Sequence, residues 1–485
     1  MSTWKRSRLV RAAGGTLALA LGTAMALTGC SGGGASNGKV TITLTGPNQF
    51  TADTDSFGPA WDKLVAAFEK ENPDITLKTN VLPIASWNQA STTQLSAGTA
   101  TELIFNQTTH KPDQVHSLDE YLEKPNPFIP GNKKWIDAFN DQYFGGDQQL
   151  GVNSQGHYEW IPFNLVGIAI YYNDDILKKV GVDPADLSTF SGFVQSCTAL
   201  KDAGYVPLAT DNGNLTQGWE MDAIASTLFD DVVDQLNQFD NAGNPGTANP
   251  IAAKSVVKGV LTGDLDLTTS PQVADSYTLL KKLNDACATP NWSGVTGSGA
   301  FTGGTDFQAG KAAMAWGTNF ASTNLSDSDF TYGTITFPTV EKSDSQYASG
   351  EGAQFGVSTG GTSYMIPSYI KGEKLDAAVK FLQFVSSPNV QEWLNGTGSI
   401  PAINGLDTPP GLDAFTDGRW ASAAPQGQNG AFVESPAALA GKNPYEGYLL
   451  GSTSLQDSLK TAQKNNETWA KEQVKDAGWT DDWAK

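Results

Sequence analysis

The chain is poor in cysteine, histidine and charge. Its 485 residues include three cysteines and three histidines, and 17% of them are Asp, Glu, Lys or Arg. Ser-His-Asp chemistry is therefore poorly supplied, and no Gly-x-Ser-x-Gly elbow presents a nucleophile. His110 and His116 flank Pro112 at a spacing that is not a zinc pattern, and no P-loop or dinucleotide fingerprint occurs. We expect the histidines to be surface residues and the protein to hold no metal and no cofactor.

Basic residues are scarce relative to acidic ones. The sequence has 31 Lys and Arg against 51 Asp and Glu, and four of the basic residues lie in the first 29 positions, which hold no acidic residue. With 27 basic and 51 acidic residues, the chain from Cys30 onward has a net charge of −24. A chain this acidic does not bind nucleic acid or an anionic membrane surface by bulk electrostatics.

A long apolar run occurs near the N-terminus, from about Ala12 to Leu27. It is too short and too glycine-interrupted for a membrane span, which needs about 20 apolar residues. Four basic residues between Lys5 and Arg11 precede it, as in a secretory signal. The tetrad at its end, Leu27-Thr-Gly-Cys30, resembles the bacterial lipobox, in which acyl chains such as palmitate are attached to the cysteine and cleavage makes it the N-terminus. The alternative is an ordinary signal peptide with a chance cysteine.

We therefore expect residues 1–29 to be a lipoprotein signal peptide. Residues 30–37 would be the lipidated Cys30 and a flexible tether, because this stretch has no side chain able to build a core. No later stretch looks membrane-spanning, so the lipid would be the only membrane contact. The expected location is the extracellular face of the cytoplasmic membrane, in an envelope of Gram-positive type.

Cys197 and Cys287 are the two remaining cysteines, and both lie in stretches with helical periodicity. An even number of cysteines in an oxidising compartment permits a disulfide. The alternative is two separate buried thiols, since the sequence does not show whether the two backbones approach within disulfide range.

Hydrophobic periodicity divides the chain into two regions. Strand patterns at 40–44, 75–81 and 102–105 alternate with helix patterns at 61–70 and 87–95, which implies parallel strands with right-handed crossovers. Further on, two strand-like runs meet near Pro162 and Asn164. The rest is helix-rich; helices are expected at 176–180, 189–203, 223–236, 250–261 and 271–287, with a short strand at 207–210.

Several segments resemble, in order, those of extracellular solute-binding proteins of family 1, the maltose-binding type. They are Ser96–Asn106, Leu118–Leu122, Trp160–Leu177, Phe307–Trp316, Thr336–Pro338 with Gly360–Pro367, Ala377–Val385 and Gly398–Ala402. Two features depart from the family pattern: Glu102 stands where Asp is usual, and glycine-rich insertions occupy residues 212–246 and 405–447.

The resemblance implies an α/β, two-lobed, periplasmic-binding-protein-like fold of type II, with a hinge between the lobes. The N-terminal lobe would comprise 38–165 plus 345–405, and the C-terminal lobe 166–344 plus 406–485. It implies a monomeric, non-enzymatic receptor that captures a carbohydrate, an oligosaccharide, and delivers it to the permease subunits of an ABC transporter.

A sugar ring has an apolar face that stacks on Trp or Tyr and a rim of hydroxyls that needs donors and acceptors. Trp316 is the first candidate for stacking, because it lies at an expected strand end where the resemblance places a ligand-contacting aromatic residue; the alternative is a core position. Asn319 follows it as a ligand-binding candidate. Trp219 and Glu220 lie in an expected turn, 214–220, that faces the cleft in related proteins; the alternative is a rim position without contacts.

Asn106 and Gln107 follow the buried strand of the first lobe, and Asn48 follows the first strand at the same end of the sheet. We expect them to bind sugar hydroxyls; simple strand-end capping is the alternative. Gly361 and Ser363 could offer backbone amides close to a ligand, or form a turn into a hinge strand. Phe355 completes the list of expected ligand-binding residues.

Two other functions need to be weighed. A secreted carbohydrate-active enzyme, a glycosidase, would need two carboxylates across a scissile bond, but no acidic pair is singled out by a local motif. Tyr171-Tyr172 resembles the tyrosine pair of some iron-binding relatives, yet neighbouring strand residues point to opposite faces, which favours a structural role.

Overall fold

The computed structural model describes residues 39–48, 56–145, 150–153, 155–295, 300–355, 357–427, 431–439 and 442–485. They belong to one compact unit, Lys39–Lys485. The expected signal peptide, Cys30 and the tether at 30–37 lie outside the described residues. In the described ranges, no helix combines the length and the apolar character that crossing a membrane requires.

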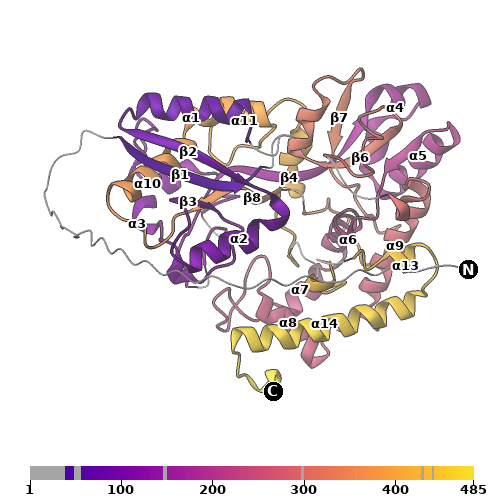
Figure 1. Cartoon of the computed structure of the whole chain (residues 1–485). Coiled ribbons are helices and arrows are strands. Elements are labelled where there is room, and N and C mark those ends of the chain that lie inside the picture. The colour runs from indigo at the N-terminus through magenta and orange to yellow at the C-terminus, as the bar shows by residue number, and fades with distance from the viewer. Residues whose placement is uncertain are drawn as a thin grey trace, which may run out of the picture. The chain divides into compact units, whose positions relative to one another are not determined.

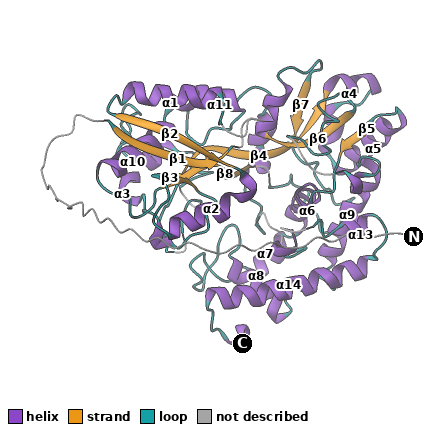
Figure 2. Ribbon diagram, in the orientation of Figure 1, coloured by secondary structure: helices purple, strands orange, loops and turns teal. Residues whose placement is uncertain are grey.

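The described strands form one mixed sheet with the order β2-β1-β3-β8-β4-β6-β5, and β7 pairs with β4 (Figures 1 and 2). Their bounds are β1 Val40–Pro47, β2 Ile75–Leu82, β3 Leu103–Phe105, β4 Ile161–Asn173, β5 Val206–Ala209, β6 Ala312–Thr318, β7 Tyr332–Ile335 and β8 Val357–Met365.

Helices cover this sheet (Figure 2). Those before β6 are α1 Pro59–Glu71, α2 Ile84–Ser96, α3 Asp119–Leu122, α4 Asp174–Val180, α5 Phe190–Asp202, α6 Asn214–Leu228, α7 Asp230–Leu236, α8 Ala253–Thr262 and α9 Pro271–Cys287. Those after β8 are α10 Glu373–Val385, α11 Gln391–Thr397, α12 Pro436–Leu439, α13 Glu446–Leu449 and α14 Leu455–Ala477.

The first five elements confirm the predicted alternation of strands and helices. β1 pairs in parallel with β2, from Val40↔Ile75 onward, and with β3. α1 begins with proline and buries Trp61, Leu64 and Phe68, which recur at helical spacing and cover the sheet. The regular spacing of these apolar residues is why the sequence predicts this region well.

β4 is one continuous strand, where the sequence suggests two runs meeting at Pro162 and Asn164. Its first half, from Ile161 to Gly167, pairs antiparallel with β8, and bulges flank Asn164. Its second half pairs with β6 and β7, beginning at Ile168↔Thr318. Proline lacks a backbone donor and is tolerated at such irregular positions. The strand therefore runs from one region of the sheet into the other.

The region around α6 differs from the prediction. Residues 214–220 are expected as a turn but form the first turns of α6, and the single helix expected at 223–236 is broken at Phe229. Phe229 has φ −112° and ψ 5°, and Asp230 and Asp231 begin α7. Glycine at 213 and 218 suggests a turn, but most of α6 is buried, and tertiary packing overrides that local preference.

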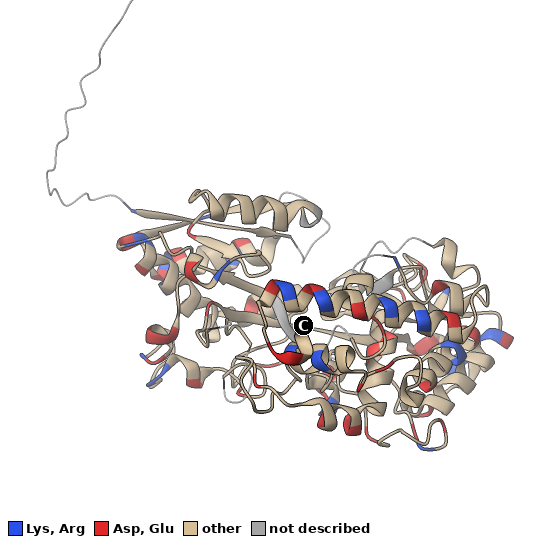
Figure 3. Cartoon of the chain, turned by 90° about the horizontal axis from the view of Figure 1, so that it is seen from below, with Lys and Arg blue, Asp and Glu red and all other residues tan. Residues whose placement is uncertain are grey.

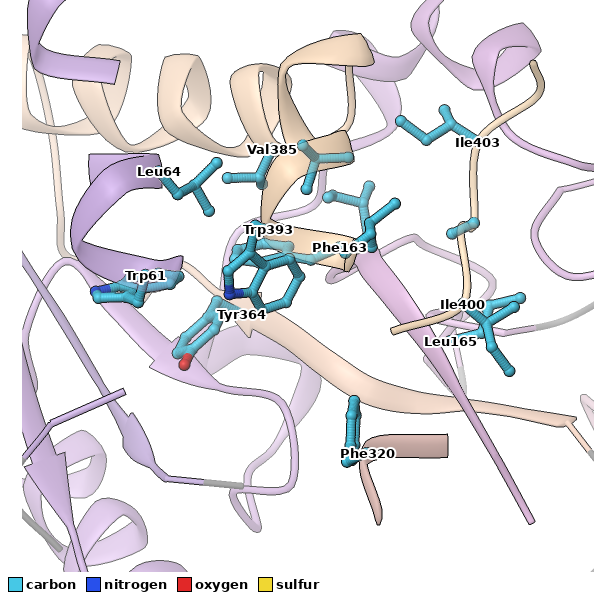
Figure 4. Close-up of a cluster of buried hydrophobic side chains, with 14 of the residues drawn as sticks. Trp61, Leu64, Phe163, Leu165, Phe320, Tyr364, Val385, Trp393, Ile400 and Ile403 are labelled. Atoms are coloured by element: carbon cyan, nitrogen blue, oxygen red, sulfur yellow. The ribbon is translucent and has the colours of Figure 1, made fainter. Parts of the chain in front are cut away.

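Two large clusters of buried apolar side chains lie along the sheet. Figure 4 shows part of the first, in which Phe163 of β4 packs against Tyr364 of β8, with ring centroids 5.2 Å apart, and lies near Trp61 and Trp393. The second cluster is built mainly by α5, α6, α8, α9 and α14. Tyr171 belongs to the first cluster and its neighbour Ile170 to the second. The exact lobe boundaries stay a prediction.

Candidate ligand-binding site

Strand pairing gathers four polar residues where β3 ends beside β8 and β4. The backbone N–H of Asn106, just after β3, donates to the carbonyl of Ser363 over 2.9 Å. On the other side of β8, Pro162 of β4 pairs with Ser363, and Asn164 pairs with Thr362. We call Asn106, Asn164, Thr362 and Ser363 the strand junction.

The strand junction holds buried polar atoms that have no hydrogen-bond partner among the described residues. They are Oδ1 of Asn106, Oδ1 of Asn164, Oγ1 of Thr362 and Oγ of Ser363. Nε1 of Trp87 on α2 shares this property, and its ring packs edge-on against Phe105 of β3 with centroids 6.0 Å apart. Each such group costs about 1–3 kcal/mol unless a ligand or water satisfies it. Thr362 and Ser363 are neighbours in β8, so their side chains point to opposite faces of the sheet. The junction thus offers neutral donors and acceptors on both faces, and one bound molecule would use only part of the set.

Trp316, at the end of β6, is fully buried in an aromatic cluster. Its ring stacks on Phe337 at 6.0 Å and on Trp420 at 6.2 Å, while Trp219 of α6 meets it edge-on at 6.3 Å. We call these four rings, together with Glu220, the aromatic cluster. Trp316 has no exposed surface in this conformation, so its stacking on a sugar stays a prediction. Trp219 is partly exposed and is the ring of the cluster best placed for stacking.

Glu220 is held within the aromatic cluster as a buried carboxyl. Nε1 of Trp316 donates to Oε1 of Glu220 over 3.1 Å. Burial raises the pKa of Glu220 to about 8; the bond from Trp316 opposes this rise and nearby Asp211 adds to it. Glu220 is therefore mostly neutral at pH 7, and it can donate as well as accept hydrogen bonds.

Asn319 uses both ends of its side-chain amide within the protein. Oδ1 accepts from the N–H of Gly167, and Nδ2 donates to the carbonyl of Gly398, over 2.8 and 2.7 Å. The side chain is completely buried. Phe355 is also buried and packs edge-on against Trp420, with centroids 6.1 Å apart. These two expected ligand-binding residues occupy packing positions in this structure, and their contact with a ligand stays a prediction.

Two of the remaining expected residues lie just after strands, and the third lies in the middle of a strand rather than in a turn. Asn48 follows β1 and is half-buried, Gln107 is exposed one residue after Asn106, and Gly361 lies within β8. The structure adds Trp87, Asn164 and Thr362 as candidates. Thr362 lies between two expected positions and could have been found from the sequence. The sequence around Trp87 contains no pattern that marks it as a candidate, because it is a candidate only through its packing against Phe105 of β3.

His110 lies just beyond the strand junction and differs from the expectation of a surface residue. Its Nε2 lies 2.9 Å from Oε2 of Glu159, and its Nδ1 lies 2.7 Å from the carbonyl oxygen of Thr108. The bond to Glu159 raises the pKa of His110.

Within the described ranges, no group of three or more His, Cys, Asp or Glu residues could hold a metal ion.

Cys197 and Cys287 are joined by a disulfide, with Cα atoms 5.1 Å apart. The bond links α5 to α9 and resolves the two alternatives left open by the sequence.

Basic and acidic residues are mixed along the chain. Figure 3 shows Lys and Arg interspersed with Asp and Glu along the described part of the chain, also along α14.

Residues 51–392 match the sequence profile of a family described as bacterial extracellular solute-binding protein. An uncharacterized ABC transporter extracellular-binding protein of Pyrococcus horikoshii is 28% identical over 178 residues, which are 34% of this chain and 37% of the relative. The match thus spans well under half of that relative's length. A multiple sugar-binding protein of Streptococcus mutans is 22% identical over 347 residues, which are 71% of this chain and 72% of the relative.

A solved structure of a chitin oligosaccharide binding protein aligns with a TM-score of 0.62 at 19% identity, covering 89% of this chain and 99% of that one. This likeness shows the fold, the two-lobed α/β architecture of maltose-binding-type proteins, and confirms the predicted fold class.

Proposed function

We propose that this chain, which belongs to the bacterial extracellular solute-binding protein family, captures a carbohydrate, an oligosaccharide, between its two lobes and delivers it to the permease of an ABC transporter. The names of the similar proteins support this, since one is an ABC transporter extracellular-binding protein and two bind sugars. Family members bind solutes rather than transform them, so the proposal includes no catalysis.

The observation that carries the proposal is the set of unpartnered neutral groups at the strand junction. Among the residues that the structure describes, two amide oxygens and two hydroxyls are buried there without partners, and Trp87 adds an indole N–H. None of these groups is charged, and a hydroxyl can serve each of them because it both donates and accepts. Trp219 offers an apolar face for the C–H side of a sugar ring.

Asp211 and Glu220 are an acidic pair that the glycosidase alternative could use, because the charge of Asp211 acts on Glu220. Oδ1 of Asp211 accepts from Gly213 and Thr216, and Oδ2 accepts from Gly303. Both oxygens of Asp211 are thus committed to protein groups. A catalytic carboxylate must reach the scissile bond or its water, so the arrangement favours binding over hydrolysis.

Binding is tested by thermal shift and titration calorimetry of the purified protein with chitin, raffinose-type and maltose-type oligosaccharides and with monosaccharides. A ligand at 100 times its dissociation constant should stabilise the protein by about 2.7 kcal/mol. Product analysis by chromatography should show the sugar unchanged. Absence of a shift with every carbohydrate, or release of shorter sugars, would contradict the proposal.

The proposed attachment to the membrane is through acyl chains on Cys30, and the tether that follows keeps the receptor near its permease. In the native host, a Cys30→Ala variant should appear in the medium and incorporate no labelled palmitate. A variant that remains with the membrane fraction and still carries label would contradict the lipid anchor, without bearing on sugar binding.

A further inference from the structure

Three segments run side by side at the point where β4 changes its partners. Gly167 is the last residue of β4 that pairs with β8, opposite Val357, and Ile168 is the first that pairs with β6. The third segment follows α11: the N–H of Leu165 donates to the carbonyl of Ile400 over 2.8 Å. β4, β8 and residues 398–400 thus meet where the sheet passes from one region to the other.

The side chain of Asn319 joins two of these segments. Asn319 begins the 3-10 helix Asn319–Leu325 directly after β6, and its amide bridges Gly167 of β4 and Gly398. Both bonds lie in a fully buried position. Asn319 is itself held in place, because its carbonyl accepts from Oγ of Ser322 over 2.7 Å.

Gly398 is fitted closely to this side of the bridge. Its φ is +63°, a conformation that favours glycine. A Cβ atom at this position would lie 2.3 Å from Oγ of Ser322 and 2.8 Å from the carbonyl oxygen of Asn319. The backbone of residues 398–400 can therefore approach the end of β6 only because a side chain is absent here.

We propose that Asn319 is a positioning residue that couples the segments crossing between the lobes, so that the lobes close on ligand as one hinged pair. The positioning role depends on the proposed function in one respect, because closure of the lobes matters only if the protein captures a ligand. A side chain that fixes the hinge reduces the conformational freedom that binding must remove. A residue that acts through the hinge alone changes the affinity for every ligand by the same factor, whereas a ligand contact would not.

The test compares Asn319→Ala with the wild-type protein. The variant should raise the Kd at least fivefold, by the same factor for several ligands of different length and linkage. Small-angle scattering of the ligand-free variant should show a broader distribution of dimensions, and hydrogen exchange at the Gly167 amide should accelerate. Gly398→Ala adds a methyl group that would collide with Ser322 and with the carbonyl of Asn319. It should therefore raise the Kd by the same factor for every ligand.

Leu325→Ala is the matched control, because Leu325 is buried in the same 3-10 helix and has no part in the bridge. It should lower the melting temperature and leave the Kd and the scattering unchanged. An unchanged Kd in Asn319→Ala, or a factor that differs between ligands as a direct contact would produce, would overturn the proposal. If no carbohydrate binds the wild-type protein, the proposed function fails, and unchanged scattering of ligand-free Asn319→Ala would then refute the positioning role separately.

Discussion

The strand junction and the aromatic cluster both bury polar groups, but only the cluster supplies its buried carboxyl with a hydrogen bond. At the strand junction, Asn106, Asn164, Thr362 and Ser363 have oxygen atoms without partners in the described part of the chain. In the aromatic cluster, Glu220 is bonded to Trp316 and is mostly neutral at pH 7. Buried unpartnered groups destabilise a fold, whereas packed rings stabilise it. We infer that the strand junction lowers the stability of the ligand-free protein and provides groups for binding. The packed rings of the aromatic cluster hold Trp219 in position.

The largest expected effect is on stability, from the fully buried ring of Trp316. Trp316→Ala should lower the free energy of unfolding by about 3–5 kcal/mol, because it opens a cavity among three other rings and removes the donor to Glu220. Denaturant unfolding measures this. A loss of unfolding free energy below about 1 kcal/mol would show that the aromatic cluster contributes little to stability.

Trp219→Ala should act on binding instead. Removing a partly exposed ring that stacks on ligand should weaken sugar binding by about 2 kcal/mol, roughly 30-fold in Kd, with little change in unfolding free energy. Calorimetry with the best ligand measures the affinity. Wild-type affinity in this variant would remove the aromatic cluster from the candidate site.

The pH dependence of stability tests the state of Glu220. Its folded-state pKa of about 8 lies above the ordinary value of 4.5, so the folded protein retains a proton that the unfolded chain loses between these pH values. The contribution of Glu220 is fully present below pH 4.5 and is lost as the pH rises through 8, by up to about 1.4 kcal/mol per pH unit. Unfolding at pH 6, 7 and 8 should show a shallower decline for Glu220→Gln than for the wild type. Equal slopes would place the carboxyl outside this environment.

The smallest effects are expected at the strand junction, and their signs should be opposite. Thr362→Val and Ser363→Ala each remove a hydroxyl without a partner among the described residues, which should stabilise the ligand-free protein by about 1 kcal/mol. The two side chains point to opposite faces of β8, so sugar binding should weaken by about the same amount in only one of the two variants. Thr397→Val is the matched control, since its hydroxyl donates to the carbonyl of Trp393 and its loss should destabilise. Destabilisation by both junction variants would mean that these hydroxyls have partners in solution.

The N-terminal strands and helices could be predicted because their signals are local. Alternating β-branched residues in β1 and the spacing of Trp61, Leu64 and Phe68 in α1 each lie within one element. The beginning of α6 was mispredicted because glycine suggested a turn, while burial by other segments makes it a helix. Local propensity fails where tertiary packing decides the conformation.

The candidate site was predictable only in part. Strand-end position singles out Asn106 and the neighbouring glycines single out Ser363; the strand junction brings these two residues together, and their contact with a ligand stays a prediction. The burial of Trp316 and the bridging role of Asn319 depend on partners far away in sequence, such as Trp420 and Gly398. No pattern within β6 reveals those partners, so the sequence could not separate a ligand contact from a packing residue.

The pairing of β3 with β8 has a consequence for the order in which the protein can form. Ile104 pairs with Met365, so the inner edge of β3 has no partner until more than 250 further residues are available. A chain delivered from its N-terminus, by a ribosome or through an export pore, therefore holds three parallel strands in an unfinished sheet for most of its passage. Such long-range pairing slows folding. The sheet can therefore be completed only after Met365 is available, when β8 joins β3 to β4.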